Sequence, residues 1–313
     1  QKALEKRNFP VKSLRLLASG RSAGREMTCL GQTWTVEELT ADSFKGIDIA
    51  LFSAGGGISR EFAPHAVKAG AVVVDNSSAF RMQQDVPLIV PEVNPEDVKK
   101  HQGVIANPNC TTIIMVVALK PLYDLSPIRR IIVSTYQSAS GAGAKGMDEL
   151  LHQTEAYLKG EPIQPHFFPH PYAFNLFSHN TDIGENGYNT EEMKMVNETR
   201  KILHDDQILV CPTCVRVPVL RSHAESIVIE QARKVSIEEA LAALSKAPGI
   251  KIVNDAVTNH YPMPSDSNEH EEVLVGRVRY DLSCPNALAL FVCGDQLLKG
   301  AALNTVQIAE LLI

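Results

Sequence analysis

The feature that most constrains the fold is a repeated order in the first third of the chain. Short apolar runs alternate with polar loops that are rich in Gly, Ser or Asn. These units cover residues 13–19, 47–57, 71–80 and 104–110. Apolar strands that end in such loops and continue into helices are typical of a parallel sheet in an α/β domain. We therefore predict an α/β domain with a mostly parallel sheet at the start of the chain.

The polar loops predict where a ligand binds. Ligands of parallel α/β sheets bind at the carboxyl ends of the strands. A helix is predicted over residues 59–70, closed by Gly70. We expect the four loops to gather along one edge of the sheet, at SGRSAG (19–24), SAGGG (53–57), DNSSAFR (75–81) and NPNC (107–110).

The pattern changes after Cys110. A helix runs from there to about Tyr123, and later β-rich segments predict a second, α+β domain with a mostly antiparallel sheet. Residues 161–187 are rich in Pro, His, Phe and Asn and predict a long functional loop. We expect residues 294–313 to be helical and to pack on the first domain. The predicted domains are residues 1–109 with 294–313, and residues 110–293.

Composition excludes several classes of function. The chain has 313 residues, enough for two domains, and its 30 basic and 36 acidic residues give a net charge of −6. This balance gives no reason to expect binding to nucleic acid or to an anionic membrane. We expect no membrane span, because no run of 18 apolar residues occurs. Six cysteines are ordinary for an intracellular protein with reduced thiols.

Cys110 is the first candidate for chemistry, in the segment ANPNCTT. It lies where a helix is predicted to begin, and the free N–H groups and dipole there favour an anion such as a thiolate. Asn109 is a candidate hydrogen-bond donor to an oxyanion. The alternative is a buried structural cysteine.

The other cysteines and histidines carry weaker signals. Cys211 and Cys214 have CxxC spacing, but no second pair follows and the surroundings predict a strand. His166 and His170 are separated by a segment that contains a proline. We therefore predict no metal site.

Charged residues supply further candidates. Arg216 and His223 are seven residues apart, and a bend near Pro218 would turn both towards one cleft, where Arg216 suits a carboxylate and His223 suits proton transfer. The alternative is a solvated sheet face. Glu191 and Lys194 share one helix face, where an exposed ion pair is the default interpretation.

Together, eight segments in order resemble the aspartate-semialdehyde dehydrogenase family. They are LLASGRSAG, ALFSAGGG, VVDNSSAFRM, NPNCTT, STYQSASGAG, EEMKMVNETRKI, CVRVPVLRSHAES and GDQLLKGAALN. The resemblance covers almost the whole chain. It implies a Rossmann-type domain that binds NADP, a second domain with most substrate contacts, and a homodimer or a dimer of dimers.

The resemblance also implies residue roles. Cys110 is the expected nucleophile, His223 the general acid/base, and Gln137 a residue that positions the substrate. The expected substrate contacts are Arg216 to the α-carboxylate, Glu191 to the α-ammonium, and Arg81 and Lys194 to the phosphate. The expected cofactor contacts are Arg21 and Ser22 at the 2′-phosphate, Ser53, Ala54 and Gly55 beneath the dinucleotide, and Ser77, Ser140, Gly141 and Gln296.

One departure from the family pattern concerns the N-terminus. The family begins with a strand and a GxTGxxG-type loop that cradles the pyrophosphate, and this sequence starts inside the helix that would follow. We expect the chain to be incomplete. The alternative is an inactive protein that lacks the loop, with weak or absent cofactor binding.

The implied reaction is reversible reductive dephosphorylation of L-4-aspartyl phosphate to L-aspartate 4-semialdehyde through a Cys110 thioester, in the pathway to Lys, Thr, Met and Ile. The alternatives are another acyl-phosphate reductase, such as N-acetyl-glutamyl-phosphate reductase, and a cofactor-free cysteine hydrolase using Cys110 and His223. The expected location is a bacterial cytoplasm, or a plastid if the source is eukaryotic.

Overall fold

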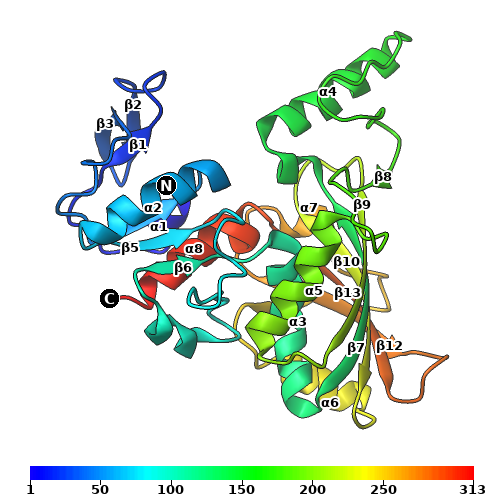
Figure 1. Ribbon diagram of the computed structural model, residues 1–313. Coiled ribbons are helices and arrows are strands. Elements are labelled where there is room, and N and C mark those ends of the chain that lie inside the picture. The colour runs from blue at the N-terminus through cyan, green and yellow to red at the C-terminus, as the bar shows by residue number, and fades with distance from the viewer. The chain divides into compact units, whose positions relative to one another are not determined.

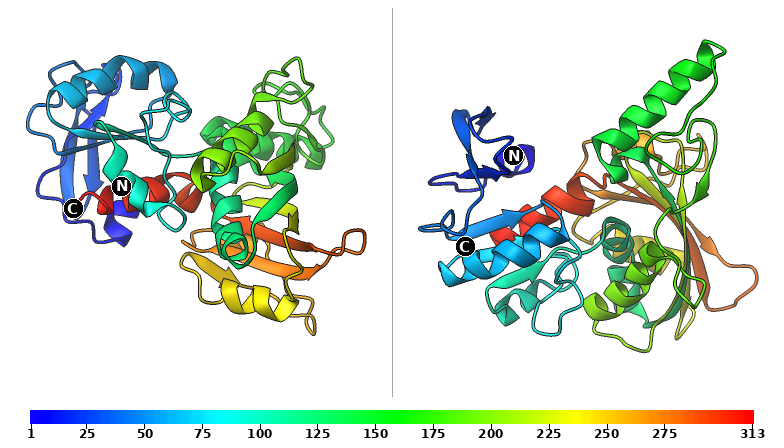
Figure 2. Two further views of the ribbon diagram at one scale, coloured as in Figure 1. Left: turned by 60° about the horizontal axis from the view of Figure 1, so that its bottom comes forward. Right: turned by 45° about the horizontal axis from the view of Figure 1, so that its top comes forward.

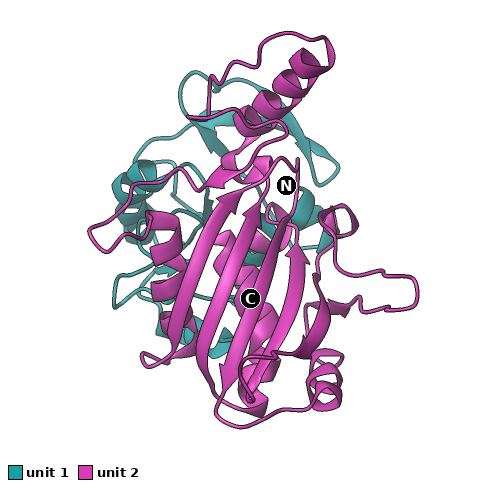
Figure 3. Cartoon of the chain, turned by 90° about the vertical axis from the view of Figure 1, so that its right-hand side faces the viewer, with its two compact units in different colours: residues 1–108, 301–313 teal, residues 109–300 magenta.

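The computed structural model describes all 313 residues and divides them into two compact units (Figure 3). Unit 1 consists of Gln1–Pro108 and Ala301–Ile313, and unit 2 of Asn109–Gly300.

Unit 1 contains the predicted parallel sheet. Its three strands are β4 (Ile49–Phe52), β5 (Val72–Asp75) and β6 (Val104–Ala106), in the order β4-β5-β6 and all parallel. Their last residues pair with one another, Phe52 with Asp75 and Asp75 with Ala106. The three loops that follow therefore start at one edge, as the sequence predicted.

Two helices pack on this sheet. Helices α2 (Gly56–Lys68) and α8 (Leu303–Glu310) both contact β5, and Ile308 of α8 lies in one apolar cluster with Val74 (Figure 2). The short helix α1 (Lys2–Lys6) packs against α8 through Leu4 and Val306.

The first predicted loop does not join the other three at this edge. It follows β1 (Leu16–Ala18), which pairs with β3 (Gln32–Glu38) in a separate sheet of order β1-β3-β2, where β2 is Glu26–Cys29. The expectation that four loops line one sheet edge was therefore wrong for residues 19–24. Strand β1 has no hydrogen-bonded partner in the β4-β5-β6 sheet, so its end is not in register with the others.

Unit 2 is built on a seven-stranded sheet (Figure 1). Four of its pairings are antiparallel and two are parallel, which confirms a mostly antiparallel sheet. The strand order is β11 (Ile250–Ile252), β12 (Val273–Tyr280), β13 (Ala287–Gly294), β10 (His223–Gln231), β7 (Ile128–Gln137), β9 (Leu209–Arg216) and β8 (Phe177–Ser178).

Helices cover one face of this sheet. The longest is α3 (Cys110–Leu125), which contacts β7, β10, β12 and β13. It is flanked by α5 (Thr190–Leu203), which packs on β9, and by α6 (Ile237–Leu244), which packs on β12. The other face is turned to the viewer in Figure 3 and carries no helix. Helices α4 (Ala144–Leu158) and α7 (Pro264–Ser267) complete the unit.

Both predicted domain boundaries shift in the structure, from 109/110 to 108/109 and from 293/294 to 300/301. Asn109 belongs with unit 2 because its side chain caps α3. Residues 294–300 also stay with unit 2: Gly294 ends β13, and Asp295 accepts hydrogen bonds from Arg221 and from the backbone of Leu297. The predicted helix over 294–313 therefore begins only with a π-helical turn, Leu298–Ala302.

None of the helices combines the length and apolar character needed to cross a bilayer.

The close packing of α3 against the sheet predicts the effect of a substitution at Gly294. A Cβ at Gly294 would lie 2.8 Å from Cγ1 of Ile114, on α3. Gly294→Ala must therefore lift α3 or displace Ile114, and we expect it to lower the free energy of unfolding by about 1–3 kcal/mol. Thermal melting measures the change, with Gly57→Ala as the control because a Cβ there meets nothing within 4 Å. Equal melting temperatures for the two variants would contradict this packing.

Candidate active site

The start of α3 presents Cys110. Asn109 is the N-cap: its Oδ1 accepts hydrogen bonds from the backbone N–H groups of Thr111 (3.1 Å) and Thr112 (3.3 Å) and from the Thr111 hydroxyl (2.6 Å). Cys110 is the first residue of the helix and is half-buried. The prediction that this cysteine begins a helix is confirmed. Cys110 therefore lies at the end of α3 that carries the partial positive charge of the helix dipole.

Three other candidates form one row across the sheet. Gln137, the last residue of β7, pairs with Arg216, the last residue of β9. His223, the first residue of β10, follows in register on the other side of β7, and it pairs with Gly294 of β13. All three side chains are at least 94% buried. Side chains in one cross-strand row lie on the same face as neighbours, so the row gathers an amide, a guanidinium and an imidazole under α3.

Glu191 joins this row to the start of α3. Its Oε1 accepts a hydrogen bond from Asn109 Nδ2 (2.9 Å) and another from Gln137 Nε2 (3.1 Å). Its Oε2 accepts one from Lys194 Nζ (2.9 Å). The carboxylate is buried, although the spacing of Glu191 and Lys194 alone favoured an exposed pair. One amide hydrogen of Asn109 is therefore engaged by Glu191.

The charge of Glu191 is secured by its partners. Burial raises the pKa of the Glu191 carboxyl, but Lys194, His179 and the hydrogen bonds outweigh it, and the pKa falls to about 2. Glu191 is therefore ionised at neutral pH, and it can attract a cationic group of a ligand.

Arg216 is buried without a matching carboxylate. Its Nε lies 3.4 Å from Asn180 Oδ1 and its Nη1 lies 3.5 Å from the Ser138 carbonyl, both long distances for hydrogen bonds. Its guanidinium also lies over the Phe168 ring, 5.5 Å from the centroid. No carboxylate is within 4 Å, so the guanidinium keeps its capacity to bind an anion.

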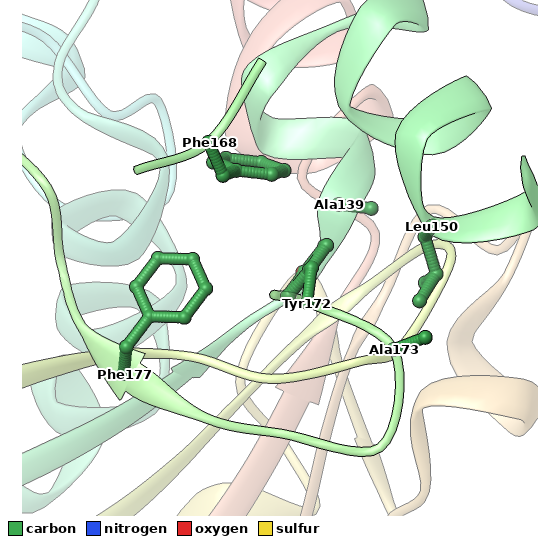
Figure 4. Close-up of a cluster of buried hydrophobic side chains, with 6 residues drawn as sticks. All are labelled: Ala139, Leu150, Phe168, Tyr172, Ala173 and Phe177. Atoms are coloured by element: carbon green, nitrogen blue, oxygen red, sulfur yellow. The ribbon is translucent and has the colours of Figure 1, made fainter. Parts of the chain in front are cut away.

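Figure 4 shows a buried cluster that includes Phe168, Tyr172 and Phe177. Phe168 of this cluster is the ring that Arg216 lies over. Phe168, Tyr172 and Phe177 pack edge to face, with ring centroids 4.7–5.7 Å apart. The Tyr172 hydroxyl donates to the carbonyl of Val217, directly after Arg216 in the chain. Sequence reasoning named none of these residues, nor His179, Asn180 and Ser138. The sequence signal for these residues was the composition of the predicted loop 161–187, because most of them lie in that loop.

His223 is fully buried and neutral. Burial, and then the charge of Arg216, lower the pKa of its imidazole to about 3. Its Nδ1 accepts a hydrogen bond from the backbone N–H of Ser138 at 3.0 Å. Its Nε2 has no partner in the protein.

Two glycines show how closely the site is packed. A Cβ at Gly141 would lie 3.0 Å from His223 Nε2 and 3.5 Å from Arg216 Nη1. A Cβ at Gly300 would lie 2.9 Å from Cys110 Cβ and 3.1 Å from Gln296 Cβ. The side chain of Gln296 in turn donates to Ser140, in the turn Ala139–Ala142. The turn that carries Ser140 and Gly141 therefore connects the surroundings of Cys110 with those of His223.

The remaining candidate cofactor residues lie in unit 1. Ser53, Ala54 and Gly55 are exposed and follow β4, and Gly55 has φ +92°, a conformation that favours glycine, at the N-cap of α2. Ser77 follows β5, and its hydroxyl donates to Asp75 (2.6 Å). Arg21 and Ser22 lie in the turn after β1, where Arg21 is exposed.

Arg81 is also in unit 1, but it is 7% exposed and already engaged. Its Nε donates to the Asn107 carbonyl (2.9 Å) and its Nη2 to the Asn76 carbonyl (3.1 Å), which ties together the loops after β5 and β6. Lys194, the other expected phosphate contact, belongs to unit 2.

The CxxC pair lies on strand β9, with Cys214 buried and both thiols free. No cluster of three or more His, Cys, Asp or Glu side chains in the chain has the arrangement of a metal site.

Comparison with known proteins assigns a family to this arrangement. Residues 1–101 match the NAD binding domain of semialdehyde dehydrogenases, and residues 119–299 match their dimerisation domain. The aspartate-semialdehyde dehydrogenase of Synechocystis sp. is 55% identical over 310 residues, which are 99% of this chain and 92% of the relative. The chain belongs to the aspartate-semialdehyde dehydrogenase family.

Solved structures agree with this family membership. A crystal structure of aspartate semialdehyde dehydrogenase II from Vibrio cholerae, complexed with ASA, has a TM-score of 0.96 at 46% identity, over 99% of this chain and 93% of that chain. The aspartate semialdehyde dehydrogenase with NADP from Candida albicans has a TM-score of 0.76 at 25% identity, over 99% and 94% of the two chains. The Rossmann-type fold and the nicotinamide-dinucleotide domain expected from the sequence are thereby confirmed.

The buried histidines predict how stability depends on pH. Burial, and then the charge of Arg216, lower the pKa of His179 from 6.5 to about 4. Because the pKa of the folded state is depressed, the stability from neutral His179 is complete above pH 6.5 and is lost as the pH falls towards 4. This loss amounts to at most about 3 kcal/mol.

The variant His179→Asn keeps an acceptor near the Thr181 hydroxyl, which lies 3.3 Å from Nδ1, and removes the titrating ring. We expect its free energy of unfolding, measured by urea titration, to fall less steeply between pH 6.5 and pH 4. An unchanged slope would show that this histidine does not titrate there.

Proposed function

We propose that the protein catalyses the reversible, NADP-dependent reductive dephosphorylation of L-4-aspartyl phosphate to L-aspartate 4-semialdehyde. The observation that carries the proposal is Arg216, a buried guanidinium without a carboxylate partner, in one row with Gln137 and His223 beneath the helix that begins at Cys110. Relatives with the same fold carry the name of this activity, and one was crystallised with ASA. The product would feed the synthesis of Lys, Thr, Met and Ile.

The charges of the site suit an amino-acid substrate. Arg216 would hold the α-carboxylate through its planar fork, and the ionised Glu191 would attract the α-ammonium. The amide of Gln137, held by Glu191, would orient the reacting carbon. An N-acylated substrate has no ammonium for Glu191, which favours aspartyl phosphate over N-acetyl-glutamyl phosphate.

Cys110 is the proposed nucleophile. Its thiolate would attack the acyl carbon, phosphate would leave, and the acyl group would remain as a thioester, which accepts a hydride far more readily than a carboxylate does. After reduction, the adduct would release the aldehyde and restore the thiolate. His223 is proposed to act on the oxygen of this adduct. Arg81 and Lys194 are the proposed phosphate contacts.

The residues present in unit 1 fit a dinucleotide. The start of α2 has no side-chain cap, so its backbone N–H groups are available to a phosphate, and Gly55 before it has no Cβ to obstruct an approaching ligand. The loops that carry Ser53 and Ser77 start at one sheet edge. When bound, NADPH would supply the hydride. Arg21 and Ser22 are proposed to favour the 2′-phosphate of NADP over NAD.

The match of residues 119–299 to a dimerisation domain supports self-association. We propose a homodimer or a dimer of dimers.

The direct test of function is NADP reduction with L-aspartate 4-semialdehyde, measured with and without phosphate. Phosphate-dependent turnover supports the proposal. Turnover only with N-acetyl-glutamate semialdehyde would replace the substrate, and absence of NADP binding would favour a cofactor-free hydrolase.

The nucleophile predicts the first variant. We expect Cys110→Ala to reduce turnover by at least about 10⁴-fold, because the covalent route is lost. Circular dichroism and NADP binding should stay unchanged. Appreciable turnover in this variant would refute the thioester scheme. Cys284→Ala is the matched control, since this cysteine is also half-buried but lies outside the site.

The carboxylate contact predicts the second variant. Arg216→Lys retains the charge but loses the planar fork, so we expect kcat/KM for the aldehyde to fall by about 10²–10³-fold. Steady-state kinetics measure the effect, and Arg233→Lys, at a half-exposed arginine, is the control. Unchanged kcat and KM would show that Arg216 does not hold the substrate.

A further inference from the structure

The hydrogen bonds around His223 determine which ring nitrogen carries its proton. A backbone N–H can only donate, and that of Ser138 points at Nδ1 from 3.0 Å. Nδ1 must therefore present its lone pair, and in a neutral imidazole the proton then lies on Nε2. The Ser138 hydroxyl oxygen is also close to Nδ1, at 3.1 Å. Whether this hydroxyl donates or accepts depends on its other hydrogen-bond partner.

A relay of three side chains fixes that direction. The backbone N–H of Ser222 donates to Gln296 Oε1 (2.9 Å), which identifies the oxygen end of this amide. Gln296 Nε2 must then donate to the Ser140 hydroxyl. Ser140 lies 3.0 Å from the Ser138 hydroxyl, and because it already accepts from Gln296 we assign it as the donor to Ser138, which in turn donates to Nδ1. Every member of the relay points its hydrogen towards His223.

We infer that Ser138, Ser140 and Gln296 are positioning residues that hold His223 as the neutral tautomer protonated on Nε2. His223 then stabilises the oxygen of the covalent adduct by donating a hydrogen bond, without becoming an imidazolium and without transferring its proton. That the adduct oxygen accepts the hydrogen bond from Nε2–H rests on the proposed function. The tautomer itself rests on the protein's own hydrogen bonds.

The surroundings of His223 oppose the alternative, an imidazolium. A proton on Nδ1 would face two donors, and the ring is fully buried. The charged and titratable groups that act on it are Arg216 of β9, Glu191 of α5 and His179 after β8, and Arg216 has the largest effect of the three. The pKa of about 3 agrees with a neutral ring.

The neighbourhood of Nε2 is consistent with a donor to a ligand. Nε2 has no acceptor in the protein, and a side chain at position 141 would start 3.0 Å from it. Gly141 therefore places no side chain against this buried nitrogen. A buried N–H without an acceptor is costly unless a ligand supplies one.

The proposed chemistry balances without a proton on the adduct oxygen. When the Cys110 thiolate attacks, an S–C bond forms and the carbonyl π electrons move to oxygen. The oxyanion then re-forms the carbonyl, the C–O bond to phosphate breaks, and water protonates the departing phosphate. After reduction, the oxyanion collapses again and expels the Cys110 thiolate. Each stage needs a fixed donor at the oxygen, and none needs proton transfer there.

The test is nitrogen NMR of the full chain with ¹⁵N-labelled histidine. Two-bond proton–nitrogen spectra distinguish protonated from unprotonated ring nitrogens, and loss of signals in His223→Gln assigns them. We expect Nε2 protonated and Nδ1 unprotonated from pH 6 to pH 8. A protonated Nδ1, alone or in an imidazolium, would overturn the inference even in an active enzyme.

Gln296→Glu reverses the relay with almost no change in shape. The new carboxylate accepts from Ser140, which then accepts from Ser138, so the hydroxyl donor to Nδ1 is lost. We expect the Nδ1 signal to shift away from the protonated position, because Nδ1 loses one of its two hydrogen-bond donors and keeps only the Ser138 backbone N–H, and we expect kcat to fall by roughly 10-fold or more. Gln207→Glu adds the same charge at an exposed position and should change neither. A wild-type Nδ1 signal in folded Gln296→Glu would show that the relay does not act on His223.

Ser140→Ala interrupts the relay without adding charge, and it keeps the test decisive if Gln296→Glu fails to fold. We expect a smaller shift of the Nδ1 signal in the same direction, and an unshifted signal would count against the relay. The NMR result is independent of turnover. A protein with the expected tautomer but no NADP reduction would refute the proposed function and leave the inference standing.

Discussion

The arrangement of the site depends on the buried carboxylate of Glu191. It accepts hydrogen bonds from the cap of α3 through Asn109, from the end of β7 through Gln137, and from its own helix through Lys194. Asn109 also holds the first turn of α3 and therefore places Cys110. One charged group thus positions Cys110 relative to the row of side chains on the sheet. If the carboxylate were lost, two buried amides would lack their acceptor, which costs about 1–3 kcal/mol for each group.

A second constraint is the cost of keeping Arg216 free. A buried guanidinium without a carboxylate is unfavourable, and the protein compensates only in part, through the Phe168 ring and two long polar contacts. The edge-to-face cluster of Phe168, Tyr172 and Phe177 holds the surroundings of Arg216 in place (Figure 4). Arg216 therefore costs stability, and in return the site has a cation without a carboxylate partner that can bind an anion. This exchange of stability for binding is common at functional sites.

The sequence predicted the features that depend on local chemistry. Asn-Cys-Thr-Thr predicted a helix start at Cys110, although not the cap that Asn109 provides, and the loops after β4, β5 and β6 predicted a ligand edge. It did not predict what depends on register and burial. Spacing placed Glu191 and Lys194 together but favoured solvent, whereas packing of α5 on β9 buries Glu191. The loop after β1 was misplaced because strand pairing is a long-range property. Residues 294–300 were assigned to unit 1 because no local signal marks the bond between Arg221 and Asp295.

The claim on which the account rests is that the Cys110 sulfur carries the acyl group. It is tested most directly by mixing the protein with L-aspartate 4-semialdehyde and NADP in the absence of phosphate, in a stopped-flow spectrometer. The account predicts a rapid burst of NADPH close to one per active site. Peptide mass spectrometry of the quenched protein should then find the acyl group on the peptide that contains Cys110. A burst with the acyl group on another residue, or steady NADPH formation without any burst and without a modified peptide, would contradict it.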